Sequence, residues 1–467
     1  MRLLRHAGTT RVAFDEPNLV SCAGLVPAME LAESCDLHGI VAERVRIDGD
    51  KGANAGGKVA TVVAGMLTGA DCIDDLDVLR HGGMSALFGG VYAPSTLGEF
   101  LRAFTHGHVR QLQAASRDLL VQLARRTPLL PAGDAVAFLD VDSLLRRVYG
   151  KKKQGAGFGH AKVGGYPVLL RGLNPLIATL STPAAAPVIV ATQLRAGNAG
   201  SARGAAFLLA EAITTAKATL AAGHGVGADI VVRADSAFYS QKVIAACRRA
   251  LVRFSVTIRV DQKVKATIAS IPDDRWVEIE YPQPVWDDDQ QRFISRAQIA
   301  EARYTAFAGT RSEVTARLIV RRIPDLRKTP VDDQGVLFPV WRYHAVFTDS
   351  PFILEQAEAH HRGHAVIEQV FAELIDGPLA HLPSGRFNAN NAWLTCIAIA
   401  HNLTRALAVL AGPALATTRA ATTRHRLINV AGRVAHHARR LHLHLPTYWP
   451  WQDSWQQTWH AVHAPPI

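Results

Sequence analysis

The stretch that decides the fold of this chain is Ala135-Val136-Ala137-Phe138-Leu139-Asp140-Val141-Asp142-Ser143. Its nearly unbroken apolar run is typical of a strand buried on both faces of a sheet. Two acids close the run, and their spacing of two residues places both side chains on the same face. A single aspartate at a strand end is more often a turn cap. Two acids on one face, with further acids downstream, indicate instead that a cation, usually a metal ion, meets them there.

Composition places the chain among folded globular proteins of two or three domains. It has 467 residues, of which 48% are hydrophobic and 19% charged, which excludes a disordered protein. Lys and Arg together exceed Asp and Glu by 51 − 40 = 11. A basic excess of this size predicts a polyanionic partner, with nucleic acid first and an acidic membrane surface second.

The cysteines exclude a zinc-finger pattern and a disulfide framework, because the five form no CxxC pair: Cys22, Cys35, Cys72, Cys247 and Cys396. This usage fits a reducing cytoplasm. The sequence begins without the apolar core of a signal peptide. No charge-free apolar stretch approaches the length needed to span a bilayer. We therefore expect a soluble cytoplasmic protein with no membrane partner.

Changes in composition and in hydrophobic periodicity along the chain predict five segments. Acids near an expected helix start, Asp74, Asp75 and Asp77, are interpreted as structural and not as metal ligands. After about residue 343, a strand pattern at 344–348 and a helix pattern at 353–376 return to the texture of the core. The expected segments are a helical DNA-binding domain (1–130), the first part of an α/β core (131–260), a β-rich insertion (261–343), the second part of the core (344–411) and a basic, Trp-rich C-terminal region (412–467).

Two further acids extend the chemistry of the first strand. Asp235 ends a short β-branched strand, and Glu368 lies beside the apolar stripe of a helix expected at 353–376. With Asp142 they form a set of three carboxylates that could hold two divalent ions. Such ions activate a water or a 3′ hydroxyl and stabilise the leaving oxygen of a phosphoryl displacement, and Mg²⁺ suits carboxylate ligands. The basic net charge supplies the surroundings that DNA requires.

A basic, glycine-rich loop follows the first strand at 146–157. Backbone amides and lysines in such a loop can lie along phosphates, so Lys151, Lys152 and Lys153 are candidate DNA contacts. The alternative is simple exposure to solvent, and the spacing of a Walker loop is absent. Trp341 could stack on a flipped base, although a core position is the more frequent role of such a tryptophan.

These features together resemble the DDE transposases of bacterial insertion sequences, over roughly residues 20–445. The spacings agree, at 235 − 142 = 93 and 368 − 235 = 133 residues. The resemblance implies a ribonuclease-H-like mixed sheet flanked by helices. It also implies that Asp142, Asp235 and Glu368 are the catalytic, metal-binding triad, with Asp140 as the rival for the first place, and that the ions are two Mg²⁺, for which Mn²⁺ can substitute. The motifs that carry it are Leu139-Asp140-Val141-Asp142-Ser143, Arg233-Ala234-Asp235-Ser236-Ala237-Phe238, the helix from Arg362 to Glu368 and Asn388-Ala389-Asn390-Asn391-Ala392-Trp393.

The helix that carries Glu368 departs from the family pattern. Counted back from Glu368, the usual Tyr and Arg places hold His361 and His364, and the usual Lys place holds Ile375. By the resemblance, Arg362 and His364 become candidate phosphate contacts. The histidines of this helix could also be taken for a zinc site, but the sequence offers no second ligand cluster.

The function implied by the resemblance is a transposase that binds terminal inverted repeats, cuts the DNA and joins the 3′ ends to a target. Its partners would be double-stranded transposon ends and target DNA, and synapsis of two ends implies a homodimer on DNA. Two alternatives stay open: a DNA-binding descendant that has lost catalysis, and a stand-alone ribonuclease-H-like nuclease. Metal-dependent nicking tests the first alternative, and a strand-transfer assay tests the second.

Overall fold

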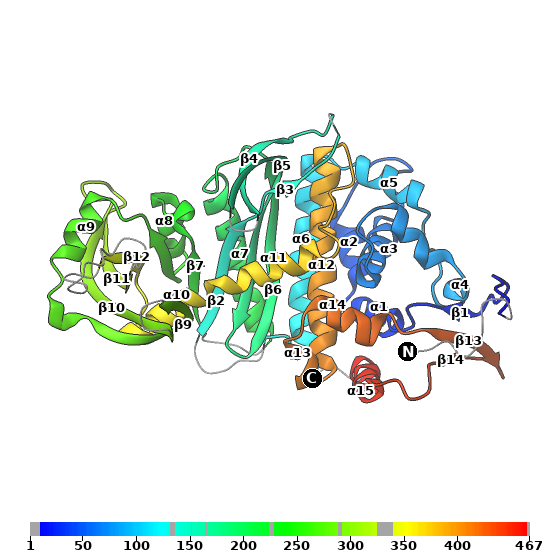
Figure 1. Ribbon diagram of the computed structural model, residues 1–467. Coiled ribbons are helices and arrows are strands. Elements are labelled where there is room, and N and C mark those ends of the chain that lie inside the picture. The colour runs from blue at the N-terminus through cyan, green and yellow to red at the C-terminus, as the bar shows by residue number, and fades with distance from the viewer. Residues whose placement is uncertain are drawn as a thin grey trace.

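A mixed sheet forms the centre of the computed structural model, which describes residues 10–130, 136–150, 152–163, 166–223, 228–287, 292–324 and 340–464. The apolar stretch of the core forms β2 (Val136–Ser143). It pairs antiparallel with β5 (Tyr166–Thr182) and parallel with β7 (Asp229–Ala234). β6 (Ala185–Ala196) continues the sheet beyond β5, and β8 (Arg253–Ile258) continues it beyond β7. The order β6-β5-β2-β7-β8, with helices on the sheet, confirms the expected ribonuclease-H-like α/β fold (Figure 1).

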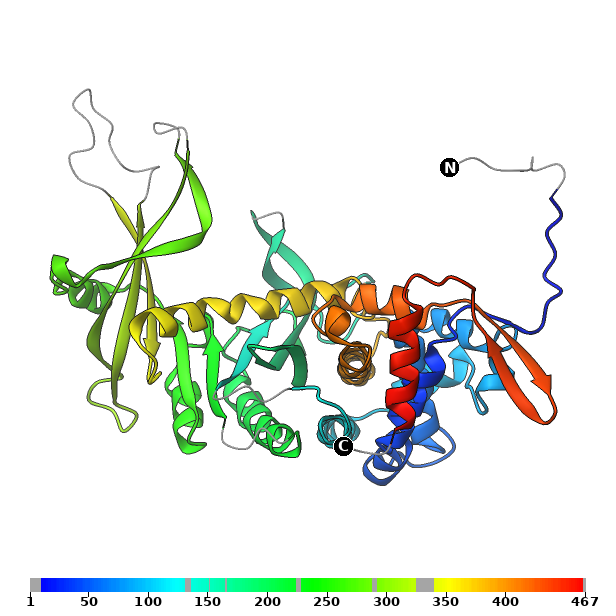
Figure 2. The same ribbon diagram turned by 90° about the horizontal axis from the view of Figure 1, so that it is seen from below.

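Helices connect and cover these strands, because β2 is buried from Val136 to Val141 and must be shielded on both faces. α7 (Ala205–Ala222) leads from β6 to β7, and α8 (Gln241–Arg249) connects the parallel neighbours β7 and β8, which need such a crossover. A long helical rod crosses the sheet from the insertion toward β6 (Figure 2). It consists of α10 (Leu354–Arg362), the 3-10 turn η5 (Gly363–Ala365) and α11 (Val366–Ile375). The helix expected at 353–376 therefore contains one tighter turn.

α12 (Phe387–Leu410) closes the edge of the sheet along β6. Asn402 binds both backbone groups of Ile189: its Oδ1 accepts from the N–H at 2.8 Å and its Nδ2 donates to the carbonyl at 2.8 Å. Asn391 accepts a hydrogen bond from the N–H of Leu194 at 3.2 Å. Side chains of α12 thus take the place of the strand that this edge lacks, and they fix the helical N-terminal part against the core.

The strands that follow β8 belong to the same sheet as the core. β12 (Trp341–Thr348) pairs with β11 on one side and with β8 on the other, so that Ala345 lies opposite both Val320 and Ile258. The sheet thereby reaches eleven strands. The expected boundary between residues 343 and 344 falls inside β12. The other elements of the insertion are α9 (Gln262–Ala269), η4 (Asp273–Arg275), β9 (Val277–Asp287), β10 (Arg292–Ala306) and β11 (Val314–Pro324).

The N-terminal part is helical, as expected, and α3 is its buried centre, packed on α2 and α12. Its elements are β1 (Leu19–Val20), α1 (Leu25–Ser34), α2 (Leu37–Arg44), α3 (Ala55–Thr68), the 3-10 helix η2 (Asp74–Arg80), α4 (Met84–Leu87), α5 (Pro94–Arg102) and α6 (His106–Arg126). The remaining elements are β3 (Arg146–Arg147), β4 (Gly157–Val163), η3 (Ser236–Phe238), α13 (Pro413–Ala416), α14 (Ala420–Thr423), η6 (Arg424–Ile428), β13 (Gly432–His437), β14 (Arg440–His444) and α15 (Gln452–His463).

Two helices, α7 and α12, are long and apolar enough to cross a bilayer by length and composition alone, although α7 contains Glu211 and Lys217 and is therefore not free of charge. In α12, 94% of the apolar window is buried inside the protein, and in α7 the share is 50%. The core helices of large globular folds meet the same criteria, because a helix surrounded by other elements is apolar all round. The burial of α12 therefore accounts for its composition.

Candidate active site

The strand register brings two of the expected acids side by side. Val141 of β2 and Ala234 of β7 are partners in the parallel ladder, so the next residue along each strand is an aspartate: Asp142 on β2, and Asp235 directly after β7. Adjacent strands lie about 4.8 Å apart, which keeps the two side chains close. The N–H of Ser143 donates to Asp142 at 2.6 Å, and the N–H of Ala237 donates to Asp235 at 2.9 Å. Both carboxylates are thus oriented by the backbone.

Glu368 approaches this pair from the first turn of α11, which packs on β2. The expected apolar stripe of the helix is buried, and Glu368 itself is exposed beside it. The pKa of Asp142 shows the proximity of the three groups. This pKa is raised to about 6, mainly by burial; the negative charges of Asp235 and Glu368 add to the rise, and the Ser143 hydrogen bond and the charge of His364 oppose it. The structure therefore gathers Asp142, Asp235 and Glu368 into one electrostatic unit, which we call the open cluster.

Among the described residues, no Lys, Arg or His side chain forms an ion pair within 4.0 Å of the carboxylate oxygens of the open cluster, although the charges of His364 and Arg195 act on Asp142 from farther away. The donors of the cluster are oxygens of carboxylates alone, which is the donor set that Mg²⁺ and other hard cations select. Like charges held together without a cation are unfavourable, so the arrangement suits a bound divalent ion. The three residues are of the chemical type that such an ion selects, although their ligand atoms do not all lie within 4.8 Å of one another in this arrangement.

Asp140, the rival for the first metal position, has a different environment. It is fully buried, and Arg233 donates to both of its oxygens at 2.7 Å, from Nε and from Nη2. His364 Nδ1 lies 2.8 Å from Oδ1 of the same carboxylate. Because Asp140 and Arg233 are register partners on β2 and β7, the pair is built into the ladder itself. We call Asp140, Arg233 and His364 the paired cluster; its occupied oxygens favour Asp142 as the first metal ligand.

The residues of the helical rod that were expected to contact phosphate have internal partners. His364 binds Asp140, as described, and its side chain is 16% exposed. Arg362 pairs with Glu358 one turn earlier, at 3.5 Å. His361 lies between two hydroxyls of β8, with Ser255 Oγ 2.9 Å from Nδ1 and Thr257 Oγ1 2.9 Å from Nε2. These histidines have separate partners, which disfavours the zinc site considered from the sequence.

The other expected DNA contacts differ in exposure. Lys151 lies outside the described residues. Lys152 is exposed, whereas Lys153 is partly buried and donates to the carbonyl of Leu382; burial lowers the pKa of the Lys153 ammonium. Trp341 is partly buried at the start of β12, and the guanidinium of Arg322 lies over its ring at 4.5 Å. That contact covers one face of the indole and favours the structural role of this tryptophan.

Sequence reasoning missed a buried cation near the open cluster. Arg195 of β6 is 5% exposed and donates to Asn174 Oδ1 at 2.8 Å and to the Ser201 carbonyl at 2.7 Å. Burial lowers the pKa of Arg195 to about 10, and the charge of Asp142 opposes that change. An arginine near the end of an otherwise apolar strand was the available signal, since a buried cation requires partners.

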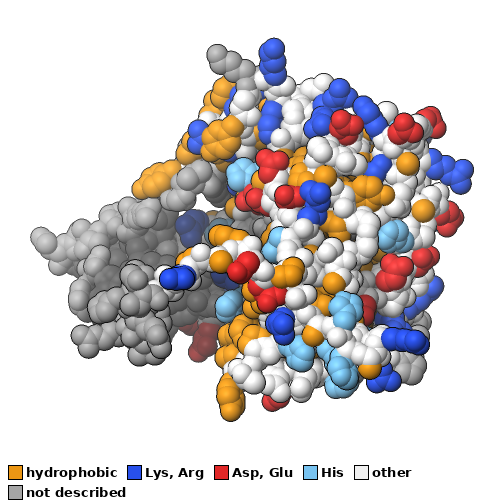
Figure 3. Space-filling model, turned by 90° about the vertical axis from the view of Figure 1, so that its right-hand side faces the viewer, with side chains coloured by type: hydrophobic (Ala, Val, Ile, Leu, Met, Phe, Trp, Pro, Cys, Tyr) orange, Lys and Arg blue, Asp and Glu red, His pale blue; other side chains and the backbone are white. Residues whose placement is uncertain are grey.

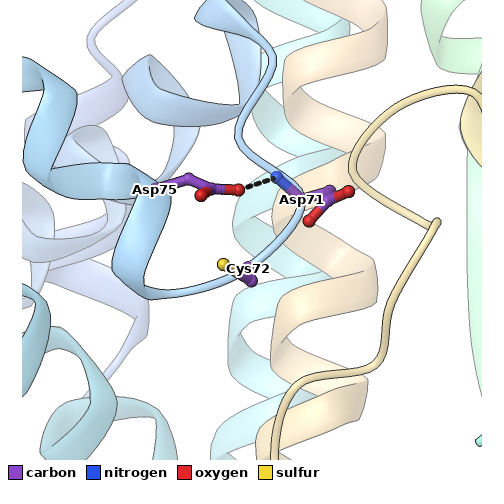
Figure 4. Close-up of side chains that lie close together, drawn as sticks. All are labelled: Asp71, Cys72 and Asp75. Carbon is purple, nitrogen blue, oxygen red and sulfur yellow. Dashed lines mark hydrogen bonds between the residues drawn. The ribbon is translucent and has the colours of Figure 1, made fainter.

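A second group of potential ligands lies in the N-terminal part, and it was not expected. Asp71, Cys72 and Asp75 bring their ligand atoms within 4.8 Å of one another, the one such trio among the residues that the structure describes (Figure 4). The backbone N–H of Asp71 donates to Asp75 Oδ2 at 3.3 Å, and His381 Nδ1 lies 3.1 Å from Asp71 Oδ1. Burial raises the pKa of the Cys72 thiol, which makes it a poor ligand at neutral pH. This trio could hold a cation only weakly.

A cleft of about 730 Å³ adjoins this second group, between the N-terminal helices and the loop after β3. The cations at its wall come from three separate elements, which no local sequence pattern would connect. They are Arg102, Arg147, Lys153 and His381.

Comparison with protein families identifies the family of this chain. The family model described as "Transposase DDE domain group 1" matches residues 5–465, nearly the whole length. A search among curated proteins found no match.

Proposed function

Because this chain belongs to the DDE transposase family, a family of enzymes that act on DNA, we propose that it cuts the ends of a mobile element and joins them to a target. The supporting observation is the open cluster of Asp142, Asp235 and Glu368, which the fold assembles from β2, the end of β7 and α11. The proposed partners are double-stranded transposon ends and target DNA. We further propose that the protein acts as a homodimer on DNA, in the cytoplasm of a bacterium.

The proposed cofactor is a pair of Mg²⁺ ions held by Asp142, Asp235 and Glu368, with Mn²⁺ as a substitute. Bound there, the ions would activate a water or a 3′ hydroxyl and stabilise the leaving oxygen of the phosphodiester. The protein residues orient the ligands. The Ala237 N–H turns Asp235 toward the end of the strand, and the backbone of β2 holds Asp142 beside it.

The paired cluster helps to hold the open cluster in position. His364 lies four residues before Glu368, which is about one helical turn, and its ring is held by Asp140 on β2. The bond therefore sets the height of Glu368 relative to the strand that carries Asp142. In this assignment Asp140, Arg233 and His364 are positioning residues, and the open cluster is the catalytic group.

Replacement of Asp235 by Asn tests the assignment. We expect Asp235→Asn to lose at least about 100-fold in Mg²⁺-dependent cleavage of element-end DNA, because an amide is a much weaker ligand than a carboxylate. Asp229→Asn is the matched control, since Asp229 is an exposed acid at the other end of the same strand. Both sites are exposed, so unfolding free energies should change by less than about 0.5 kcal/mol.

The same assay separates the alternatives. Undiminished cleavage by Asp235→Asn would refute the triad. A wild-type protein that binds element ends but never nicks them in Mg²⁺ or Mn²⁺ would be the inactive descendant. Cleavage without joining of 3′ ends to a target duplex would identify a stand-alone nuclease.

A further inference from the structure

The C-terminal hairpin of β13 and β14 has one basic face and one apolar face. Paired residues of an antiparallel ladder share a face, and the faces alternate along each strand. Arg433 pairs with His444, Ala435 with His442, and His437 with Arg440, so these residues form one face. Val434 pairs with Leu443 and His436 with Leu441 on the opposite face. We define the basic face by its cationic and imidazole side chains: Arg433, His437, Arg440, His442 and His444.

The base of the hairpin is fixed and its basic face is exposed. β1 pairs with β13, Val434 is 1% exposed, and its N–H donates to the Asn18 carbonyl at 2.9 Å. All five side chains of the basic face are exposed. The imidazoles of His442 and His444 stack with centroids 6.3 Å apart, which shows that they line up along one face. The ribbon projects beyond the neighbouring helices (Figure 2).

Almost no acid neutralises this surface. The sequence has no Asp or Glu between Asp376 and Asp453. Among the described residues, the one carboxylate that reaches the basic face is that of Glu16, 4.0 Å from Arg433 at the base of the hairpin. The end of the molecule to which the hairpin belongs carries several histidine and Lys/Arg side chains in its lower half (Figure 3). The uncompensated charge requires a polyanion or water as its partner.

The turn of the hairpin presents a further cation at the tip. Ala438 and Arg439 both have positive φ values, of 47° and 66°. This is the conformation of a tight two-residue hairpin turn, in which Asn and Gly are the favoured residues. Neither residue here is favoured in the left-handed region, so the turn keeps an exposed arginine at a cost in backbone strain. The turn thus extends the charge of the basic face to the end of the ribbon.

We propose that the basic face of the β13–β14 hairpin binds the phosphate backbone of duplex DNA, as a contact region separate from the open cluster. This inference rests on the proposed function. Double-stranded DNA carries one negative charge per 1.7 Å of axis, and its major groove, about 12 Å wide, admits a two-stranded ribbon. α12 and the N-terminal helices lie between the hairpin and the strands that carry the acids in both views (Figures 1 and 2). The hairpin therefore holds DNA at a distance from the cleaved bond.

Two matched double variants of the full chain test the proposal. Arg440→Ala with His442→Ala removes two side chains of the basic face, and His436→Ala with Leu441→Ala removes a register pair of the opposite face. Fluorescence anisotropy measures the affinity for an element-end duplex and for an unrelated duplex of equal length, over a series of KCl concentrations. We expect the first variant to bind both duplexes roughly tenfold more weakly, because hydrogen bonds to charged groups are lost. Its salt slope should fall by about 0.9 for each lost phosphate contact. The second variant should bind like the wild type.

A conservative variant keeps the test decisive if the first variant folds poorly. Arg440→Lys retains the charge, and its affinity and salt slope should stay close to those of the wild type. Equal affinities of the two double variants would overturn the proposal, and so would a loss confined to the element-end duplex, which would mean base recognition. Asp235→Asn should keep its DNA affinity and lose nicking, whereas the basic-face variant should lose affinity for both duplexes and require a higher DNA concentration for half-maximal nicking. The failure of the hairpin proposal is thereby distinguished from the failure of the proposed function.

Discussion

The core has two groups of charged residues, the paired cluster and the open cluster. Their members on β2, Asp140 and Asp142, lie two residues apart. In the paired cluster, Asp140 is fully buried and bonded to Arg233 and His364. In the open cluster, Asp142 has two acids as its neighbours and a pKa raised to about 6. The residue type, the strand and the face are shared, and the difference lies in what stands opposite on β7. Arg233 is the register partner of Asp140, whereas Asp142 follows the last pair of the ladder, Val141 and Ala234, just as Asp235 does on β7. Partner chemistry, more than residue type, assigns the role of each acid.

The paired cluster also joins three elements. Arg233 packs over the Phe138 ring at 4.0 Å and donates to the His360 carbonyl at 2.6 Å, so it links β7 to β2 and to the helical rod. Gly363 makes this contact possible, because an added Cβ would lie 2.7 Å from Arg233 Nη1. The tighter turn of the rod therefore lies at the point where the guanidinium meets the helix. We therefore expect the paired cluster to contribute mainly to stability, and we propose the catalytic role for the open cluster.

The largest effect expected from this contrast is on stability. Asp140→Asn leaves the Arg233 charge buried without its counter-ion and should lower the unfolding free energy by about 3–5 kcal/mol. Asp142→Asn is the matched control on the same strand; because it removes a buried charge and like-charge repulsion, it should leave the unfolding free energy at neutral pH unchanged or raise it. Urea unfolding followed by circular dichroism measures both. Equal stability of the two variants would remove the distinction between the clusters.

A smaller effect concerns His361, which anchors the rod to β8. Burial lowers its pKa to about 3, below that of an unfolded histidine. The unfolded chain therefore binds more protons between about pH 6.5 and pH 3, and stability should fall as the pH falls through this range. His361→Gln cannot take up that proton. At pH 5.5 its loss of stability relative to pH 7.5 should be smaller than that of the wild type by up to about 1.4 kcal/mol.

His401, whose pKa burial also lowers to about 3, is present in both proteins and cancels in this difference. Urea midpoints at the two pH values supply the measurement. Parallel pH profiles for the wild type and His361→Gln would contradict the role given to His361.

The smallest effect applies the same contrast to the basic loop. Lys153→Ala removes a hydrogen bond to Leu382 and should cost about 1 kcal/mol of stability, with little change in DNA binding. Lys152→Ala should leave stability unchanged and lower the salt slope of DNA binding by about 0.9, because Lys152 is exposed. Unfolding and anisotropy titrations of the two variants decide the matter. If Lys153→Ala instead weakened DNA binding and Lys152→Ala lowered stability, the contact of Lys153 with the Leu382 carbonyl would not persist in the DNA complex.

Much of the fold could be predicted from the sequence, because it depends on local periodicity. The apolar run before Asp140 predicted β2, and the β-branched run before Asp235 predicted β7. The hydrogen bonds from α12 to the sheet could not be predicted in this way. Its asparagines bind the edge of β6, which lies more than 190 residues earlier in the chain (391 − 194 = 197), and helical periodicity gives no information on such a pairing.

The candidate site could be predicted in its acids but not in their partners. The spacing of two residues placed Asp140 and Asp142 on one face and left their roles open. Only the register of β2 against β7 sets Asp140 opposite Arg233, and register is a tertiary property. The same limit applies to His361, whose two hydroxyl partners belong to a strand about a hundred residues earlier (361 − 257 = 104). The assignment of Asp142, Asp235 and Glu368 to catalysis stays a prediction.

The double pairing of β12 bears on how proteins of this shape can change in length. Ile258 and Ala345 lie opposite each other, so the polypeptide leaves the core and re-enters it at adjoining positions. The residues between Ile258 and Ala345 include the outer strands of the sheet, and a short hairpin would suffice to join β8 directly to β12. A change in the length of the segment between them would leave the pairing of β2 with β7 untouched. Throughout such changes, β2 and β7 keep the neighbours that hold their acids in place.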